Sequence, residues 1–236
     1  MHTAIVTGGT KGIGFGIARA ILGAGGRVMI TGRDERRVSD AVAQLGDGLA
    51  DRSRAAGLAV DVRDRAAVDR LVAGTARTFG GFDVLVNNAG LGRMIEVAAM
   101  SDDDWSSMID TNLTGVFYCC RAAIPHLRRS PSSWIINIAS LAGRNYFPKG
   151  AAYCASKAGL VAFTESLMQE VRMDGIRVSV IMPGSVATEF GGESVTADDA
   201  WKLSPDDIGE AVVDLLRHPA RSLPSRIEIR PAKTKK

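Results

Sequence analysis

Short apolar runs alternate with longer helical patterns along the whole chain, and this alternation constrains the fold most strongly. The predicted strands are Thr3–Thr7, Val28–Thr31, Leu58–Val62, Val84–Asn87, Trp134–Ile138, Val178–Ile181 and Ile227–Ile229. Near-continuous apolar strands separated by helices are typical of a parallel sheet that is covered on both faces. The pattern therefore predicts a doubly wound α/β fold with a mostly parallel sheet of about seven strands, right-handed crossovers, and ligands at the carboxyl ends of the strands.

The helical patterns and the length of the chain predict a single domain. The predicted helices are Ile13–Leu22, Glu35–Leu45, Ala66–Thr78, Asp102–Leu127, Ala152–Val171 and Pro205–Leu216. Ser101 is the expected N-cap of the long fourth helix, followed by an acidic first turn. A chain of 236 residues suits one larger domain, expected over residues 1–230, with a frayed basic tail over 231–236. The polar segment Gly46–Gly57 is expected to be a loop.

The charge balance argues against nucleic acid as a partner. The chain has 29 Lys and Arg against 26 Asp and Glu, but Lys233, Lys235 and Lys236 alone account for the excess of three. Because the remaining basic residues are spread along the chain, no basic face for nucleic acid is expected. The longest charge-free run, Ser130–Gly143, is shorter than the roughly 18 apolar residues of a membrane span.

The N-terminus and the cysteines indicate a cytoplasmic protein without a metal. The first residues do not resemble a signal peptide. Cys119, Cys120 and Cys154 cannot pair completely and show no metal-ligand spacing, so we expect small buried side chains in a reducing compartment.

A glycine-rich turn follows the first predicted strand. Gly8, Gly12 and Gly14 stand where the strand must turn into a helix. Glycine permits the required backbone angles and lets a diphosphate approach the helix N-terminus closely. Such turns also occur for tight strand–helix packing alone, so the turn by itself leaves both interpretations open.

Tyr153 and Lys157 form a second candidate site. They are four residues apart in a helical pattern and therefore share one helix face. A nearby ammonium group favours the phenolate, so we expect Lys157 to lower the pKa of Tyr153 and make the phenol a proton donor or acceptor. Ser140 follows a buried strand and can hold the substrate oxygen. Without further motifs, packing or a solvated face would also explain the pair.

The ordered set of motifs resembles the classical short-chain dehydrogenase/reductases over roughly residues 3 to 190. Thr7–Gly14 fits that family's T-G-x-x-x-G-x-G turn, Asn87–Gly90 fits N-N-A-G, and Tyr153–Lys157 fits Y-x-x-x-K. Pro183-Gly184 follows the sixth predicted strand, and Thr188 lies four residues beyond. The resemblance implies a Rossmann-type fold and a nicotinamide coenzyme.

The resemblance also implies roles for individual residues. The implied catalytic residues are Asn112, Ser140, Tyr153 and Lys157, with Lys157 also bonding the nicotinamide ribose and Asn112 in a proton relay through water. Asp61 and Val62, at the end of the third predicted strand, would contact the adenine. The implied coenzyme-binding residues are Gly8, Thr10, Lys11, Gly12, Ile13, Gly14, Gly32, Arg33, Asp61, Val62, Asn88, Ala89, Gly90, Tyr153, Lys157, Pro183, Gly184, Val186 and Thr188.

The residues after the second predicted strand indicate NADP(H) as the coenzyme. NAD-preferring relatives place an acidic residue where this chain has Gly32, and that carboxylate would repel a 2′-phosphate. Arg33 and Lys11 can bind the phosphate. Asp34 and Glu35 are expected to cap the next helix instead. An ordinary exposed charge is the alternative interpretation of Arg33.

These features predict an NADP-dependent oxidoreductase that transfers a hydride between NADPH and a ketone or aldehyde, reversibly, with Tyr153 as the general acid and base. A 3-oxoacyl thioester reductase is the alternative, although the glycine-rich C-terminal segment common in such enzymes is replaced by Ile227–Pro231. A non-catalytic NADP(H) sensor is a further alternative, which the intact set of catalytic residues disfavours. Ser185–Lys202 is the expected substrate lid, with Gly191-Gly192 as its hinge.

A stripe of small residues on the helix that carries Tyr153 suggests a subunit contact. Its members are Ala151, Ala155, Gly159, Ala162 and Ser166. The stripe fits either close packing on the protein's own sheet or a helix of a second subunit. The resemblance supports the second interpretation and implies a homodimer or homotetramer.

Overall fold

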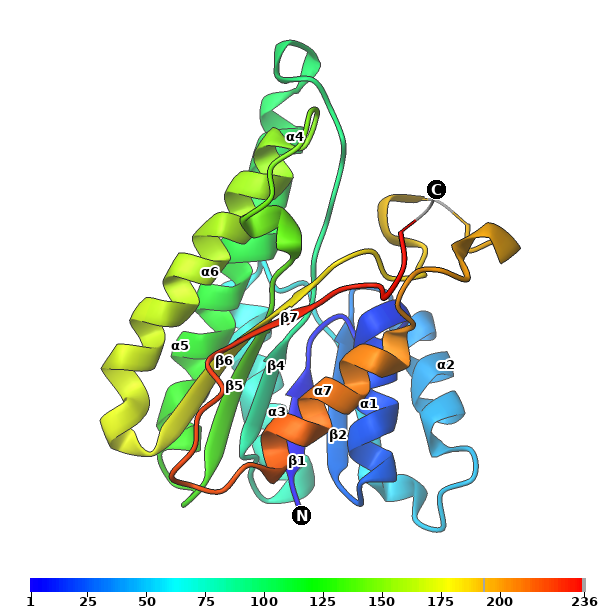
Figure 1. Ribbon diagram of the computed structural model, residues 1–236. Coiled ribbons are helices and arrows are strands. Elements are labelled where there is room, and N and C mark those ends of the chain that lie inside the picture. The colour runs from blue at the N-terminus through cyan, green and yellow to red at the C-terminus, as the bar shows by residue number, and fades with distance from the viewer. Residues whose placement is uncertain (193, 235–236) are drawn as a thin grey trace.

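The seven strands form one parallel sheet, which confirms the predicted fold class. The computed structural model describes residues 1–192 and 194–234, so the predicted end of the basic tail lies outside the described residues. The strands are β1 (Thr3–Val6), β2 (Arg27–Gly32), β3 (Ala55–Ala59), β4 (Val84–Asn87), β5 (Ser133–Ile138), β6 (Ile176–Pro183) and β7 (Arg226–Ile229). Their order is β3-β2-β1-β4-β5-β6-β7, with every neighbouring pair parallel (Figure 1). The order reverses between β1 and β4, which places a ligand crevice at their carboxyl ends.

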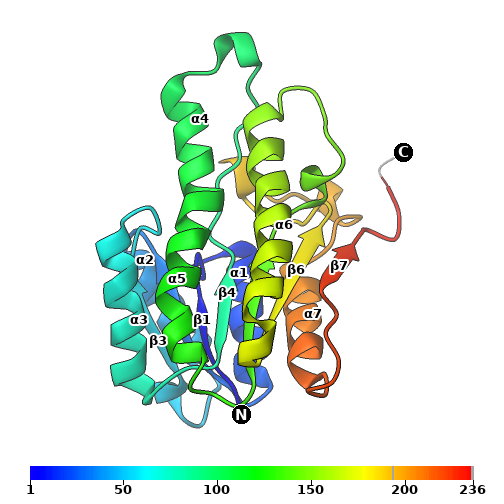
Figure 2. The ribbon, with the colours of Figure 1, turned by 90° about the vertical axis from the view of Figure 1, so that its left-hand side faces the viewer.

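Helices cover both faces of the sheet and enclose two hydrophobic cores. The α-helices are α1 (Gly12–Gly23), α2 (Glu35–Gly46), α3 (Arg65–Phe79), α4 (Asp102–Ile109), α5 (Gly115–Leu127), α6 (Ala151–Val171) and α7 (Pro205–Arg217). Apolar side chains of α1, α2 and α7 pack on one face of the sheet. Those of α3, α5 and α6 pack on the other (Figures 1 and 2). Packing on both faces fixes the position of the strands, and their carboxyl ends remain at the edge where the cavity lies.

The third strand begins three residues earlier than predicted, so the predicted bounds Leu58–Val62 are wrong. Ala55 to Ala59 pair in register with Val28 to Gly32 of β2. Backbone pairing with β2 therefore sets the bounds, rather than the most apolar run. Val60 and Val62 are buried beyond the end of the strand. The expected loop over Gly46–Gly57 accordingly holds a 3₁₀ turn, Arg52–Arg54, and the start of β3.

The predicted long helix over Asp102–Leu127 is interrupted by a π-helical turn, Asp110–Thr114, between α4 and α5. Ser101 caps α4 as expected, in a reciprocal pair with Asp104. A π turn inserts one residue into the helical ladder and is common at functional sites. Here it carries Asn112, whose side chain is fully buried.

The segment after β6 crosses the carboxyl edge of the sheet before α7 begins. It contains two short 3₁₀ turns, Phe190–Gly192 and Ala197–Asp199. Gly191 and Gly192 have φ angles of 81° and 89°, which L side chains rarely adopt. Within the described parts of the chain, no helix is both long and apolar enough to cross a bilayer.

Candidate active site

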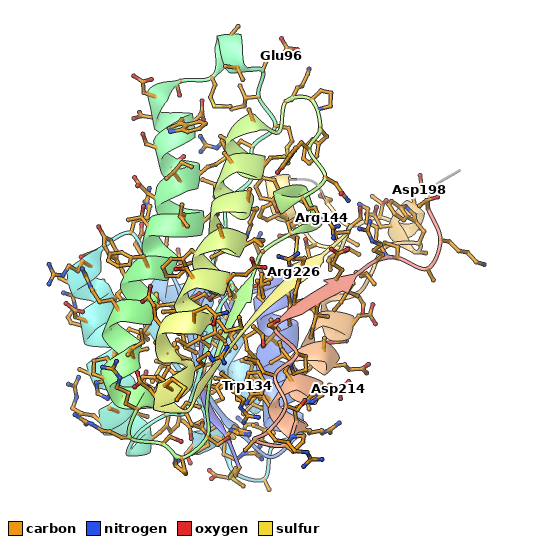
Figure 3. All side chains as sticks on the ribbon, turned by 60° about the vertical axis from the view of Figure 1, so that its left-hand side comes forward. Glu96, Trp134, Arg144, Asp198, Asp214 and Arg226 are labelled. Carbon is orange, nitrogen blue, oxygen red and sulfur yellow. The ribbon has the colours of Figure 1, made fainter. Side chains whose placement is uncertain are left out.

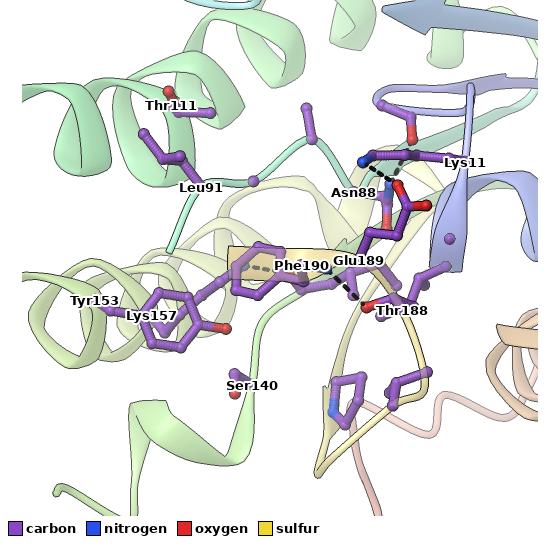
Figure 4. A pocket seen from close by; sticks show the side chains of 18 of the residues that line it. Lys11, Asn88, Leu91, Thr111, Ser140, Tyr153, Lys157, Thr188, Glu189 and Phe190 are labelled. Atoms are coloured by element: carbon purple, nitrogen blue, oxygen red, sulfur yellow. Dashed lines mark hydrogen bonds and ion pairs between the residues drawn. The ribbon is translucent and has the colours of Figure 1, made fainter. Parts of the chain in front are cut away.

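A cavity of about 1190 Å³ runs along the carboxyl edge of the sheet and brings together most of the predicted site residues (Figure 4). The predicted residues that line it are Gly8, Thr10, Lys11, Gly12, Ile13, Gly32, Arg33, Asp61, Val62, Asn88, Ala89, Gly90, Ser140, Tyr153, Lys157, Pro183, Gly184, Val186 and Thr188. Gly14 and Asn112 are not part of its wall. A Cβ at Gly14 would lie 2.3 Å from the Gly8 carbonyl oxygen, so this glycine allows the helix to pack on the turn.

The glycine-rich turn is shaped to hold an anion. Gly8 and Gly12 have φ angles of 65° and 55°, and α1 begins directly after Lys11 without a side-chain cap. The N–H groups of the first helical turn therefore remain available for a phosphate, aided by the helix dipole. Asn88 holds the turn in place, because its Nδ2 donates to the carbonyl oxygens of Thr7 at 2.9 Å and Gly8 at 3.1 Å. These features fit the diphosphate of a dinucleotide.

Two arginines that make no ion pair within the described residues lie where the cavity passes β2 and α2. Arg33 is exposed, and Arg37, which is not among the residues predicted from the sequence, joins it in the cavity wall. Asp34 caps α2 by accepting from the Arg37 N–H at 2.8 Å, as expected. Arg63 holds Asp61 with its guanidinium at 2.6 Å, and this bond lowers the pKa of the Asp61 carboxyl.

Lys11 has a partner that the sequence does not predict. Its Nζ lies 2.8 Å from Oε2 of Glu189, a residue of the segment that follows β6 (Figure 4). Both side chains are more than half exposed. A phosphate that binds Lys11 must therefore compete with Glu189.

Tyr153 and Lys157 are both buried, and burial shifts their pKa values in opposite directions. Desolvation raises the pKa of Tyr153, an effect that the nearby Ser140 hydroxyl opposes, and it lowers the pKa of Lys157 to about 8. Lys157 Nζ donates to the Ile138 carbonyl at 2.9 Å and lies 6.0 Å from the centroid of the Tyr153 ring. The expectation that the pKa of Tyr153 is lowered is thus wrong for this arrangement, because burial penalises the phenolate more than its neighbours stabilise it.

Asn112 fixes the loop after β4 to the helix that carries Tyr153. Its Oδ1 accepts from the Leu91 N–H at 2.7 Å, and its Nδ2 donates to the Leu91 carbonyl at 2.8 Å and to Ser156 Oγ at 2.9 Å. Ser156 in turn donates to the Tyr153 carbonyl at 2.8 Å. Ser156 is not predicted from the sequence; the signal that could have identified it is its place just before Lys157 in the Tyr153–Lys157 motif.

Apolar side chains surround Tyr153 at the other end of the cavity. The Phe190 ring lies 5.7 Å from the Tyr153 ring, centroid to centroid. Gly92 permits this contact, since a Cβ there would lie 2.4 Å from Phe190 Cε1. Leu91, Met94 and Phe147, which were not predicted from the sequence, line the same cavity.

Charged residues near this end are paired within the chain. Arg144 Nη1 lies 2.8 Å from Glu228, Lys149 lies 3.2 Å from Glu96, and Arg93 pairs with Asp104. Figure 3 shows Glu96 at the end of the molecule opposite Trp134 and Asp214, with Arg144 between them. Among the described residues, no group of three or more His, Cys, Asp or Glu is placed to hold a metal ion.

Known proteins resemble this chain over nearly its full length. The short chain dehydrogenase family model matches residues 2–199. An uncharacterized oxidoreductase of Staphylococcus saprophyticus is 35% identical over 232 residues, covering 97% of this chain and 96% of the relative.

Two solved structures share the fold and contain a related coenzyme. An alcohol dehydrogenase of Thermococcus sibiricus with 5-hydroxy-NADP superposes with a TM-score of 0.91 at 27% identity, covering 100% of this chain and 99% of the other. The closed form of a serine dehydrogenase with NADP⁺ gives a TM-score of 0.86 at 34% identity, covering 96% and 94%. The protein is an oxidoreductase that belongs to the classical short-chain dehydrogenase/reductase family.

Proposed function

We propose that the protein is an NADP(H)-dependent carbonyl reductase, working reversibly between a ketone or aldehyde and its alcohol. One observation carries the proposal: a single cavity joins the uncapped N-terminus of α1 to the buried Tyr153 and Lys157 and to the partly buried Ser140. The first feature suits a coenzyme diphosphate, and the second suits a carbonyl oxygen.

The buried residues supply the proton chemistry. The bound nicotinamide would supply or accept the hydride. Tyr153 keeps its proton at neutral pH, because burial raises its pKa, and can donate it to the carbonyl oxygen. The Ser140 hydroxyl holds the same oxygen, and the Lys157 ammonium stabilises the phenolate that remains.

Asn112 and Ser156 position this machinery. Together they fix the backbone of Leu91 and of Tyr153. We propose that Asn112 also takes part in a proton relay through water, as the family resemblance implies.

The adenosine end of the cavity favours NADP(H) over NAD(H). Gly32 leaves no room for a carboxylate, because a Cβ there would lie 2.6 Å from Thr10 Cγ2. Arg33 and Arg37 stand beside it in the cavity wall. A 2′-phosphate would give these cations a charge-assisted partner. The NADP-type ligands of the two structural neighbours support the same preference.

The remaining expectations stand as proposals: one domain over residues 1–230, a cytoplasmic location, and a homodimer or homotetramer. The family match over residues 2–199 supports the single domain, and the family resemblance supports the assembly of like subunits.

The test is to follow NADPH absorbance while purified protein is mixed with a panel of ketones and aldehydes. We expect turnover that depends on the carbonyl compound, and slower turnover with NADH at low concentrations. Tight NADPH binding without turnover on any compound would instead support the sensor.

A further inference from the structure

We infer that the substrate is an uncharged carbonyl compound that carries an aromatic group, an inference that rests on the proposed reductase function. The inference specifies the chemical class of ligand for the part of the cavity that lies beyond Tyr153. Three features of the cavity wall carry it: exposed aromatic side chains, the apolar surroundings of the phenol, and the pairing of the cations.

Large apolar side chains of the cavity wall are left in contact with solvent. Phe147 is 41% exposed, Phe190 43% and Met94 49%, and all three line the cavity that holds Tyr153. They come from three separate segments: the loop after β4, the loop before α6, and the segment after β6. Exposed apolar side chains that converge on one concave site are typical of a surface that buries an apolar ligand.

The surroundings of the phenol are apolar as well. Tyr153 belongs to a hydrophobic cluster with Met108, Ala142 and Ala152, against which Leu91 packs. The Phe190 ring makes a tilted contact with the Tyr153 ring. A substrate ring beside them would extend this aromatic group in an offset or tilted geometry, which aromatic pairs prefer.

The cations of the cavity wall near this end are already paired. Arg93 is bound to Asp104, and Lys202 Nζ lies 2.6 Å from Asp199. Lys157 donates a hydrogen bond to the Ile138 carbonyl, and the proposed proton chemistry assigns its charge to the Tyr153 phenolate. A substrate carboxylate here would have to break an existing ion pair or remain unpaired in an apolar site, and both are costly.

The same pairing argues against a carrier-bound acyl group. Two exposed cations outside the cavity wall, Arg144 and Lys149, are paired with Glu228 and Glu96. A phosphorylated carrier would need free basic groups near the opening. Arg33 and Arg37, which make no ion pair within the described chain, lie instead at the adenosine end.

The test uses four α-keto probes that separate charge from ring: ethyl benzoylformate, benzoylformate, ethyl pyruvate and pyruvate. With NADPH, we expect kcat/KM for ethyl benzoylformate to exceed that for ethyl pyruvate at least about tenfold. We expect each anion to react at least about 100-fold more slowly than its ester. Phe147→Ala and Phe190→Ala should each reduce the aryl-to-methyl ratio several-fold. Met173→Ala, which removes an exposed apolar side chain outside the cavity wall, should leave the ratio unchanged.

A binding measurement separates this inference from the proposed reaction and from the reactivity of the probes. Calorimetry on the NADPH complex of Tyr153→Phe should give the same order of affinities, since no reduction is required. If no probe is reduced but this order holds, the reductase function fails and the ligand class stands. Two results would overturn the inference. One is that the anions bind as well as their esters, and the other is that neither Phe147→Ala nor Phe190→Ala changes the aryl-to-methyl ratio.

Discussion

Burial reverses the order in which Tyr153 and Lys157 lose their protons. An unperturbed phenol titrates near pH 10, slightly below an unperturbed lysine. In this site the pKa of Tyr153 is raised, whereas that of Lys157 is lowered to about 8. Lysine therefore loses its proton first, and the phenol remains an acid throughout the physiological range.

This order predicts the pH dependence of reduction. Below about pH 8 Lys157 is charged and stabilises the phenolate that forms on Tyr153, and above it this stabilisation is lost. We expect kcat/KM for the carbonyl compound to fall as pH rises through about 8. Steady-state rates from pH 6 to 10, under conditions where the protein remains folded, check this. A flat profile up to pH 9.5 would contradict the assignment.

We expect the coenzyme preference to depend on single residues as well. Arg33→Ser should lower the preference for NADPH over NADH by about tenfold or more, because one charge-assisted contact to the phosphate is lost. Changing Lys11 alone should lower the preference less, because Lys11 already forms an ion pair with Glu189. Changing Lys11 and Arg33 together should remove most of the preference. Arg36→Ser is the matched control, because Arg36 is exposed but is not part of the cavity wall. Equal use of NADH and NADPH by the wild type would refute the proposal.

The structure adds several residues to those that motifs could identify. Tyr153, Lys157 and the glycine turn belong to contiguous patterns, which a sequence displays directly. Arg37, Phe147 and Phe190 belong to a helix, a loop and a 3₁₀ turn that meet only in the folded chain, at the edge of the sheet. The sequence around each of these three residues gives no indication that they lie in the same cavity wall.

At the scale of elements, the order and type of strands and helices followed from hydrophobic patterning. The bounds of β3 and the break between α4 and α5 did not, and other strand ends, those of β6 among them, differ by one or two residues. The ladder to β2 sets the bounds of β3, and a strand pairing is not local information. The π turn at Asp110–Thr114 leaves a helical apolar pattern on either side, so the chain looks continuous. The turn carries Asn112, whose hydrogen bonds to Leu91 and Ser156 join segments that lie far apart in the sequence.

An exposed ion pair between Lys11 and Glu189 links the segment after β6 to the glycine-rich turn. Glu189→Gln removes the partner of Lys11, so the lysine becomes free to meet a 2′-phosphate. We expect NADPH to bind about two- to fivefold more tightly, with NADH affinity changed less, because exposed ion pairs are weak and screened by salt. Coenzyme titrations at low and high salt check this. Weaker NADPH binding in the variant would show that Glu189 supports the site instead.

On the scale of the whole molecule, α6 presents an unusual face to solvent. Ala151, Ala155, Ala162 and Ser166 of the small-residue stripe are exposed, so packing on the protein's own sheet does not explain them. Trp105 of α4 and Phe117 of α5 are also partly exposed, and α5 and α6 lie side by side on one face in Figure 2. We therefore retain the prediction that a second copy of the chain packs here.

Ala162→Arg tests this assembly. A long cation in the middle of a two-fold helix contact should separate the subunits, because each helix would meet its own copy. Ser39→Arg on the exposed side of α2 is the matched control and should leave the assembly intact. Sedimentation of the three proteins gives the result, and a monomeric wild type would contradict the prediction.

The most direct test of the central claim is the turnover of Tyr153→Phe with NADPH and a carbonyl compound that the wild type reduces. The substitution removes the phenolic proton and keeps the ring against Phe190. We predict that kcat falls at least about 100-fold, the usual cost of losing a general acid, while NADPH affinity is retained. Nearly normal turnover in this variant would contradict the account.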